Sequence, residues 1–302
     1  MQKFLNYINT ELQGHFEPNE IQSFAFLIIE NVCGMSRTEI IINKNTIFSE
    51  VNQQMMHSFV DKLKNNVPIQ YILGKTFFYN CDFFVTPAVL IPRPETEELV
   101  DWIISDWKQA QKANILDIGT GSGCIAISLK KALKHAQVSA FDISDEALQI
   151  AQKNAESNNL IVDFKQVDIL NTSVQATKWD CIVSNPPYIP INEITEIRSN
   201  VRDHEPHLAL FVPKHDPLLF YREIASFAKQ HLNNGGCLYF EIHRSKGPEC
   251  VEMLHNMGFK NIVLRQDIFK NDRMIKAQYS EENVAPELNH EAKTASIHKT
   301  NF

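Results

Sequence analysis

The strongest chemical signal in the chain is the tetrapeptide Asn185-Pro186-Pro187-Tyr188, which directly follows the apolar run WDCIVS. Two adjacent prolines restrict φ and stiffen the turn, so they hold the Asn185 carboxamide and the Pro186 carbonyl in place. An amide or aryl amine nitrogen is a poor nucleophile because its lone pair is delocalised. If its two N–H groups donate to these two oxygens, the lone pair is aimed at an electrophile, and the charge that develops on nitrogen is stabilised. We expect Tyr188 to pack against the planar group.

This motif specifies a class of nitrogen and leaves the substrate open. A glutamine amide and the exocyclic amine of adenine or cytosine are all planar and carry two N–H groups. The structural alternative is a proline-rich turn after a strand, with no role in chemistry. We interpret Asn185, Pro186 and Tyr188 as catalytic, and all four residues from Asn185 to Tyr188 as substrate-binding.

A second signal is the segment NILDIGTGSGCIAISL, whose pattern is an apolar strand, a glycine turn and a helix. Glycine allows a tight turn and lets a ligand lie against bare main chain. Asp142 follows about two dozen residues later, at the end of the next predicted strand. An acid in that position accepts hydrogen bonds from both ribose hydroxyls of an adenosine ligand.

The spacing of the glycines bears on which adenosine ligand is bound. A dinucleotide fingerprint is G-x-G-x-x-G, whereas Gly119, Gly121 and Gly123 form G-x-G-x-G. Asp117 precedes them, and its carboxylate would repel a pyrophosphate but attract an ammonium group, directly or through water. S-adenosylmethionine has an ammonium, a sulfonium and no phosphate. We therefore favour S-adenosylmethionine over a nucleotide or a turn without a ligand.

Asp168 follows the third predicted strand, where such folds place a group near the adenine ring; the alternative is a solvated loop acid. The predicted cofactor contacts, with Thr120 of the turn included, are Asp117, Gly119, Thr120, Gly121, Gly123, Asp142, Asp168 and Asn185.

From residue 114 onward the apolar pattern alternates between strand and helix, which indicates a parallel sheet covered on both faces. The ligand site of such a sheet lies outside the carboxyl ends of its strands, where both signals above are located. The expected strands are 114–118, 137–141, 162–166, 180–184 and 237–242, with two more at 261–265 and 273–279, and the expected helices are 122–134, 145–158 and 216–232.

The N-terminal residues have the spacing of helices instead. Gly34 is placed to end one helix, and Ser36 and Glu39 have the S-x-x-E spacing of a capping box. A last helix is expected from Ser49 to about Lys64. This region has seven acidic and six basic residues within 1–80, so it shows no positive face for nucleic acid.

We divide the chain into four parts. Residues 1–68 are predicted to form a helical substrate-docking domain, and 69–90 a β-hairpin linker, because that segment is rich in aromatic and β-branched residues. Residues 91–280 are predicted to form a Rossmann-like α/β domain. The polar, patternless residues 281–302 are expected to be a disordered tail.

Composition narrows the function further. The net charge of −7 argues against binding of duplex DNA or bulk RNA. The six cysteines include no C-x-x-C pair, so we expect no metal site. We also expect a reducing compartment, in which the cysteines form no disulfides. The N-terminus lacks the features of a signal peptide, and no apolar run is long enough to span a membrane. These features predict a cytoplasmic protein.

With these motifs in view, the chain resembles the bacterial release factor glutamine methyltransferases, the HemK/PrmC family, over roughly residues 10–280. The motifs that carry the resemblance are IPRPETEELV (91–100), LDIGTGSGCIAI (116–127), VSNPPYI (183–189), EPHLALF (205–211) and NDR (271–273). The resemblance implies a helical N-terminal domain, a hairpin linker and a class I S-adenosylmethionine methyltransferase domain. It also implies methylation of the glutamine side-chain nitrogen in the GGQ motif of class 1 peptide chain release factors.

Two more residues are assigned to substrate binding. Arg93 lies in a segment expected to cover the active site, and Glu205 is expected to shape its far wall together with Pro206. The alternative for Glu205 is a purely structural role. The structural alternative for Arg93 is a salt bridge with Glu95, Glu97 or Glu98. Family members often have an aromatic residue where this chain has Ile169.

Three other functions are weighed against this one. They are a glutamine methyltransferase acting on ribosomal protein L3, an adenine methyltransferase acting on DNA or RNA, and an inactive adaptor. The neutral helical region argues against the adenine enzyme, and Asp117, Asp142 and Asn185 argue against the adaptor.

Overall fold

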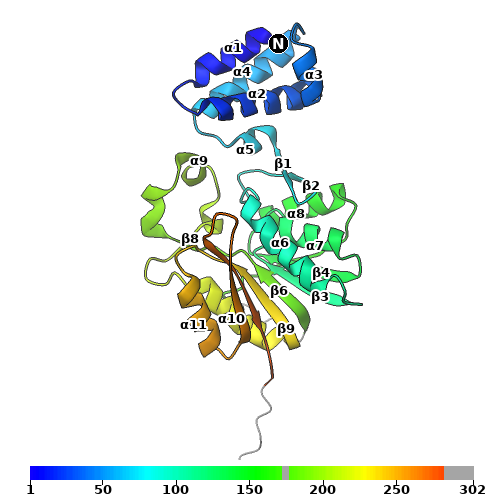
Figure 1. Ribbon diagram of the computed structural model, residues 1–302, viewed down its shortest axis with the longest axis vertical. Helices are drawn as coiled ribbons and strands as arrows, with labels where there is room; N and C mark the ends of the chain where they lie inside the picture. Colours follow the sequence, from blue (N-terminus) through cyan, green and yellow to red (C-terminus); the bar gives the residue numbers. More distant parts are fainter. Residues whose placement is uncertain (172–176, 282–302) are drawn as a thin grey trace, which may run out of the picture.

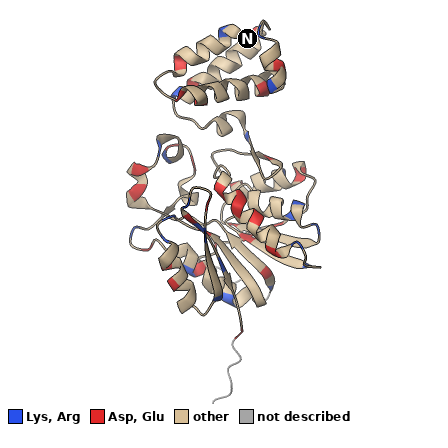
Figure 2. Cartoon of the chain, in the orientation of Figure 1, with Lys and Arg blue, Asp and Glu red and all other residues tan. Residues whose placement is uncertain are grey.

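The computed structural model describes residues 1–171 and 177–281; the predicted tail, 281–302, lies outside them apart from Glu281. The N-terminal helices form a bundle at the top of Figure 1. They are α1 (Gln2–Leu12), α2 (Pro18–Cys33), α3 (Arg37–Ile42) and α4 (Glu50–Lys64). Their apolar faces share one core that includes Ile8, Leu12, Ile28, Ile29 and Met56. Basic and acidic residues both occur along the bundle (Figure 2).

The predicted helix ends of the bundle are confirmed. Gly34 ends α2 in the left-handed conformation, with φ of +65°. Ser36 and Glu39 form the capping box at the start of α3, where the Ser36 backbone N–H donates to the Glu39 carboxylate at 2.8 Å. Ser49 caps α4 through the backbone N–H of Asn52.

The linker is only partly the hairpin that was predicted for 69–90. The hairpin is limited to β1 (Lys75–Phe78) and β2 (Cys81–Phe84), whereas Ile69–Leu73 forms the short helix α5. Tyr71 and Ile72, whose side chains favour strands, are helical here because Ile72 is buried against the bundle core. Tertiary burial thus overrode local propensity in this segment.

The second part of the chain is built on a seven-stranded sheet of order β10-β11-β9-β6-β3-β4-β5. The strands are β3 (Ala113–Ile118), β4 (Ala136–Asp142), β5 (Asp163–Gln166), β6 (Trp179–Ser184), β9 (Leu232–Glu241), β10 (Lys260–Gln266) and β11 (Asp272–Gln278). Neighbouring strands from β9 to β5 are parallel, but β11 is antiparallel to both β9 and β10. The expectation of a parallel sheet is therefore wrong at this edge, because a tight turn joins β10 to β11.

Helices cover both faces of the sheet (Figure 1). On one face, α6 (Pro94–Trp107) and α7 (Cys124–Ala132) share a core with the hairpin and with Ile115 and Val183 of the strands. On the other, α10 (Leu219–His231) and α11 (Gly247–Asn256) pack on Leu116 and Ile182. Adjacent strand residues thus enter opposite cores, as the period of two requires.

The remaining elements complete the domain. Helix α8 (Asp145–Ser157) follows β4, and one residue range, 189–212, is inserted after β6. The insertion contains the short elements β7 (Ile189–Pro190), η1 (Ile191–Glu196), α9 (Ser199–Arg202), η2 (His207–Ala209) and β8 (Phe211–Val212). The strands and helices that were predicted agree with the observed ones to within a few residues, except that β9 begins at Leu232. Helix α11 and the short elements of the insertion were not predicted.

Membrane-spanning helices and metal-binding clusters are both absent from the part of the chain that the structure describes. None of the helices in this part of the chain is long and apolar enough to cross a membrane. Within residues 1–171 and 177–281, no group of three or more His, Cys, Asp or Glu side chains is placed to hold a metal ion.

Candidate active site

The candidate site is a cavity of about 430 Å³ at the carboxyl ends of the central strands. Strands β3, β4 and β6 are adjacent and parallel, so the loops that follow Ile118, Asp142 and Ser184 meet at one edge of the sheet. The Ser184 hydroxyl donates to the Ile118 carbonyl at 2.7 Å, which ties two of these strand ends together. The structure therefore brings the glycine turn and the Asn-Pro-Pro-Tyr loop to one cavity.

The glycine turn has the backbone that only glycine adopts easily. Gly119, Gly121 and Gly123 have φ of +72°, +54° and +81°. Gly119 and Gly121 line the cavity together with Thr120, and added methyl groups on them would meet nothing within 4 Å. Gly123 does not line it, and a methyl there would lie 2.9 Å from the Ile127 side chain. Gly123 thus serves the packing of α7.

Asp142 lies at the end of β4 with its carboxylate at the cavity. One oxygen accepts the Gly121 backbone N–H at 2.8 Å, and the other accepts that of Ser144 at 3.0 Å. Burial raises the pKa of this carboxyl, and the backbone hydrogen bonds oppose the rise. The acid thus orders the glycine turn and still presents oxygen lone pairs to a ligand, since each oxygen has two.

Asp117 lies behind the turn and is fully buried. Its Oδ2 accepts the Thr120 hydroxyl at 2.6 Å, whereas Oδ1 has no hydrogen-bond partner among the described residues. Burial raises the pKa of this carboxyl to about 7. A buried carboxylate oxygen without a partner is costly, and a ligand's ammonium group would compensate it. The residue thus fits S-adenosylmethionine, although it is not in the cavity wall itself.

Asp168 lines the cavity from the loop that follows β5. Its carboxylate accepts the Leu170 backbone N–H at 2.9 Å and the Asn171 amide at 2.7 Å, so it shapes the loop. The same loop places Val167, Ile169 and Leu170 against the cavity. This part of the wall is aliphatic, at the position where the resemblance implied an aromatic residue.

The Asn-Pro-Pro-Tyr loop divides between cavity and core. Asn185, Pro186 and Pro187 line the cavity, and the Asn185 amide N–H donates to the Thr96 hydroxyl at 3.5 Å. Tyr188 does not line it. The Tyr188 ring lies 5.7 Å from that of His243 between ring centres, and burial raises the pKa of its hydroxyl. The structure therefore places Tyr188 in support of the loop.

Arg93 and Glu205, both predicted at the substrate site, are partners of each other. The Arg93 guanidinium pairs with the Glu205 carboxylate at 2.5 Å, and the second Glu205 oxygen accepts the Ile91 backbone N–H. Arg93 lines the cavity, whereas the Glu205 side chain is 1% exposed. The alternative salt bridges of Arg93 with acids of α6 are not what the structure shows, because Glu97 and Glu98 accept backbone N–H groups instead.

Several lining residues were not predicted. They belong to the strap before α6, to the insertion after β6, and to α6 and α10: Pro87, Ala88, Val89, Leu90, Pro92, Thr96, Leu208, Ala209, Phe220 and Ile224. Pro206, which was expected on the far wall with Glu205, also lines the cavity. The proline pattern around 91–94 was the signal for the strap, because clustered prolines hold a segment extended. The others carry no local signal, since only the chain's folding places them at the cavity.

Comparison with known proteins gives consistent results. The Methyltransferase small domain model matches residues 99–201, and the PrmC N-terminal domain model matches residues 4–74. A release factor glutamine methyltransferase of Flavobacterium psychrophilum is 46% identical over 89% of this chain and 95% of its own length. One of Bacteroides thetaiotaomicron is 44% identical over 92% of this chain and 99% of its own length.

A comparison of structures supports the fold alone. The catalytic domain of hMettl16, solved with a 3′UTR hairpin, superposes with a TM-score of 0.54 at 16% identity. It covers 77% of this chain, and this chain covers 82% of it.

Proposed function

The chain belongs to the family of release factor glutamine methyltransferases, and we propose that it methylates the side-chain amide nitrogen of the glutamine in the GGQ motif of class 1 peptide chain release factors. The observation that carries the proposal is the position of Asn185 and Pro186 in the wall of the cavity that the glycine turn and Asp142 also line. This arrangement sets an acceptor pair for a planar nitrogen beside a site for an adenosine ligand. We place the reaction in the cytoplasm.

The cofactor would be held by residues of three strand ends. Gly119 and Gly121 leave space for a ligand against the main chain, and Asp142 would accept the ribose hydroxyls. Asp117 would face the ammonium group, and the aliphatic wall around Ile169 would cover the adenine. S-adenosylmethionine supplies a methyl group already activated by its sulfonium.

The protein's contribution to the chemistry is orientation. Asn185 Oδ1 and the Pro186 carbonyl would each accept one N–H of the glutamine amide, so the nitrogen lone pair points at the methyl carbon. As the N–C bond forms and the C–S bond breaks, positive charge grows on nitrogen, and the two oxygens stabilise it where it forms. The amide then loses one proton to water, and S-adenosylhomocysteine leaves. No strong general base is needed.

The N-terminal helices, 1–68, are proposed to dock the release factor. They are joined to the cavity by the linker, since the Tyr71 hydroxyl donates to the Val89 carbonyl at 2.6 Å and Val89 lines the cavity. A docked protein would thus be positioned relative to the strap. The bundle carries both signs of charge, as expected for a protein partner.

The direct test is methyl transfer from labelled S-adenosylmethionine. Purified class 1 release factor, its GGQ-glutamine→Ala variant, ribosomal protein L3 and DNA are tested in parallel. Label on the wild-type release factor and none on the variant is the expected result. Label on L3 would keep the mechanism and change the substrate, and label on DNA would show that the interpretation of the helical region was wrong. Absence of transfer with the cofactor bound would refute the proposal.

A further inference from the structure

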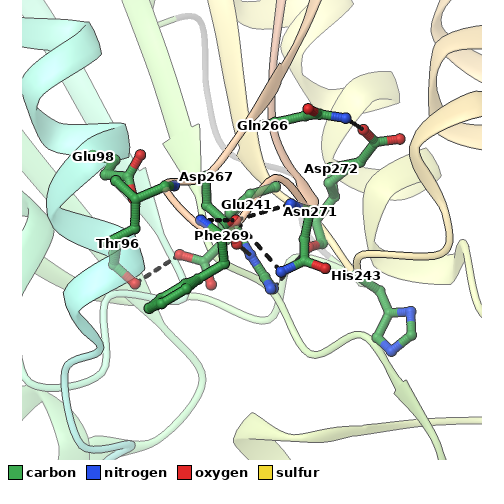
Figure 3. Close-up of polar contacts among 12 residues, drawn as sticks. Thr96, Glu98, Glu241, His243, Gln266, Asp267, Phe269, Asn271 and Asp272 are labelled. Atoms are coloured by element: carbon green, nitrogen blue, oxygen red, sulfur yellow. Dashed lines mark hydrogen bonds and ion pairs between the residues drawn. The ribbon is translucent and has the colours of Figure 1, made fainter.

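A chain of hydrogen bonds runs from Asn185 away from the cavity into the protein interior. Asn185 Nδ2 donates to Thr96 Oγ1 at 3.5 Å, and Thr96 Oγ1 donates to Glu241 Oε2 at 2.6 Å. Thr96 lies in the first turn of α6, and Glu241 ends β9. Thr96 and Glu241 are both 2% exposed, so water does not compete for the hydrogen bond between them. Figure 3 shows the Thr96–Glu241 bond beside the β10–β11 turn.

These two hydrogen bonds run in one direction, because the Thr96 hydroxyl carries only one proton. An ionised carboxylate can only accept, so Glu241 takes the Thr96 proton and leaves Thr96 Oγ1 as an acceptor toward Asn185. A carboxamide has one accepting end and one donating end. If Asn185 were turned over, its Oδ1 would face the lone pairs of Thr96 Oγ1, and no proton would lie between them. The amide end of Asn185 must therefore face Thr96.

We propose that Thr96 and Glu241 are positioning residues that set the orientation of the Asn185 carboxamide, so that Oδ1 faces the substrate nitrogen. The inference rests on the proposed function, in which Oδ1 accepts a substrate N–H. A donating amide end in that position would repel the substrate N–H and could not stabilise the positive charge on its nitrogen. The 3.5 Å link is long, as hydrogen bonds of catalytic groups often are before the substrate binds.

The NDR motif (271–273) acts on the charge of Glu241 through Arg273. The Arg273 side chain is only 15% exposed, and its Nε pairs with Asp267 at 3.1 Å close to these hydrogen bonds. Asp267 in turn accepts backbone N–H groups of the β10–β11 turn (Figure 3). The positive charge of Arg273 favours ionised Glu241, which the directed chain requires. The motif therefore supports Asn185 through two intermediate side chains.

The charge on Glu241 depends on its surroundings. Burial raises the pKa of this carboxyl to about 7, Glu95 adds to the rise, and the Thr96 hydrogen bond, Arg273 and Arg93 oppose it. When Glu241 is protonated, it can donate to Thr96 and free the Thr96 proton to point at Asn185. The orientation of the carboxamide is then no longer determined.

Two substitutions at Thr96 test the hydroxyl. Thr96→Val keeps the shape and removes the donor and acceptor, so kcat on the release factor should fall on the order of tenfold or more. The affinity for S-adenosylmethionine should stay within about threefold, because Asp142 and the glycine turn are untouched. Thr96→Ser keeps the hydroxyl and should retain most of the turnover. Ser128→Ala removes a buried hydroxyl of α7 that has no hydrogen-bond partner in residues 1–171 and 177–281, and it should leave kcat unchanged.

The pH profile tests Glu241. At saturating S-adenosylmethionine, wild-type kcat should fall as the pH drops through about 7, because protonated Glu241 no longer directs the chain. Glu241→Gln cannot titrate, so its kcat should be lower and should not change over this range. Saturation removes the contributions that Asp117 and Asp142 make through cofactor binding.

A second readout does not depend on the substrate. The side-chain amide resonance of Asn185, identified by its loss in Asn185→Ser, should shift in Thr96→Val and Glu241→Gln and move with pH around 7 in the wild type. An unchanged resonance in both variants would overturn the inference, as would wild-type kcat in Thr96→Val or equal losses in Thr96→Val and Thr96→Ser. If the wild type methylates no release factor, the proposed function fails, and this resonance still decides the orientation of Asn185.

Discussion

Among the single residues of the site, some side-chain oxygens accept hydrogen bonds from the protein, and others remain available to a ligand. Both Asp142 oxygens accept backbone N–H groups, so this acid orders the glycine turn before any ligand arrives. Within the described part of the chain, one buried Asp117 oxygen has no hydrogen-bond partner, which is costly in a folded protein and points to a cationic ligand group. Asn185 has its amide end occupied by Thr96, which leaves its oxygen for the substrate.

The role of Asn185 gives a prediction about turnover. Asn185→Ala removes one of two acceptors for the substrate N–H groups, and kcat should fall by about a hundredfold to a thousandfold. The dissociation constant of S-adenosylmethionine, measured by calorimetry, should change by less than about threefold.

Asp142→Asn is the matched comparison, because it removes the charge from the predicted ribose acceptor and should mainly weaken cofactor binding. Asp145→Asn, which changes an exposed acid of α8, should affect neither. A collapse of cofactor affinity in Asn185→Ala with turnover almost unchanged would contradict the assigned role.

At the scale of elements, the cavity is enclosed by segments that are distant in sequence. The strap 87–93 comes from the linker, and residues 206–209 come from the insertion after β6. The Arg93–Glu205 ion pair joins the two, and Glu205 also accepts the Ile91 N–H of the strap. Because Glu205 is buried and Arg93 is only one-third exposed, this pair is better protected from solvent than a surface pair.

Glu205→Gln should therefore loosen the join between strap and insertion. The substitution leaves Arg93 without its counter-charge, and the free energy of unfolding should fall by about 1–2 kcal/mol, measured by urea denaturation. Glu223→Gln, which removes a more exposed partner of Arg222, should cost less than about 0.5 kcal/mol. Equal losses of unfolding free energy in the two variants would show that the Arg93–Glu205 pair stabilises the fold no more than a surface ion pair does.

At the scale of the whole molecule, two buried acids with raised pKa values lie close to the candidate site, Asp117 and Glu241, each with a pKa of about 7. In the unfolded chain they would titrate near 4. Between about pH 4 and pH 7 the folded state holds protons that the unfolded state has lost, so stability falls as the pH rises. Their contribution is fully present below about pH 4 and is lost above about pH 7.

Asp117→Asn should remove one of these two contributions. Without cofactor, the melting temperature of this variant should fall less between pH 5 and pH 8 than that of the wild type, as measured by calorimetry. Added S-adenosylmethionine should stabilise the wild type more than the variant at pH 8, because its ammonium group compensates the ionised carboxylate. Parallel pH profiles of the two proteins would show that Asp117 keeps an ordinary pKa.

Most of the elements and the identity of the site loops follow from local sequence patterns. The alternation of strand and helix and the ends of α2, α3 and α4 are local patterns, because helix caps and hydrophobic period depend on nearby residues. The same holds for the glycine turn and for Asn185 to Tyr188. These motifs follow parallel strands, so their meeting at one edge could also be predicted.

The packing of distant segments, by contrast, sets which residues become partners. The Arg93–Glu205 pair spans 112 residues and the Thr96–Glu241 bond spans 145, and no local pattern encodes either contact. Burial decided that Ile69–Leu73 is helical and that Tyr188 supports the loop behind the cavity. Such contacts depend on how whole elements pack, because the free energy gained by burying a side chain exists only once distant segments exclude water together.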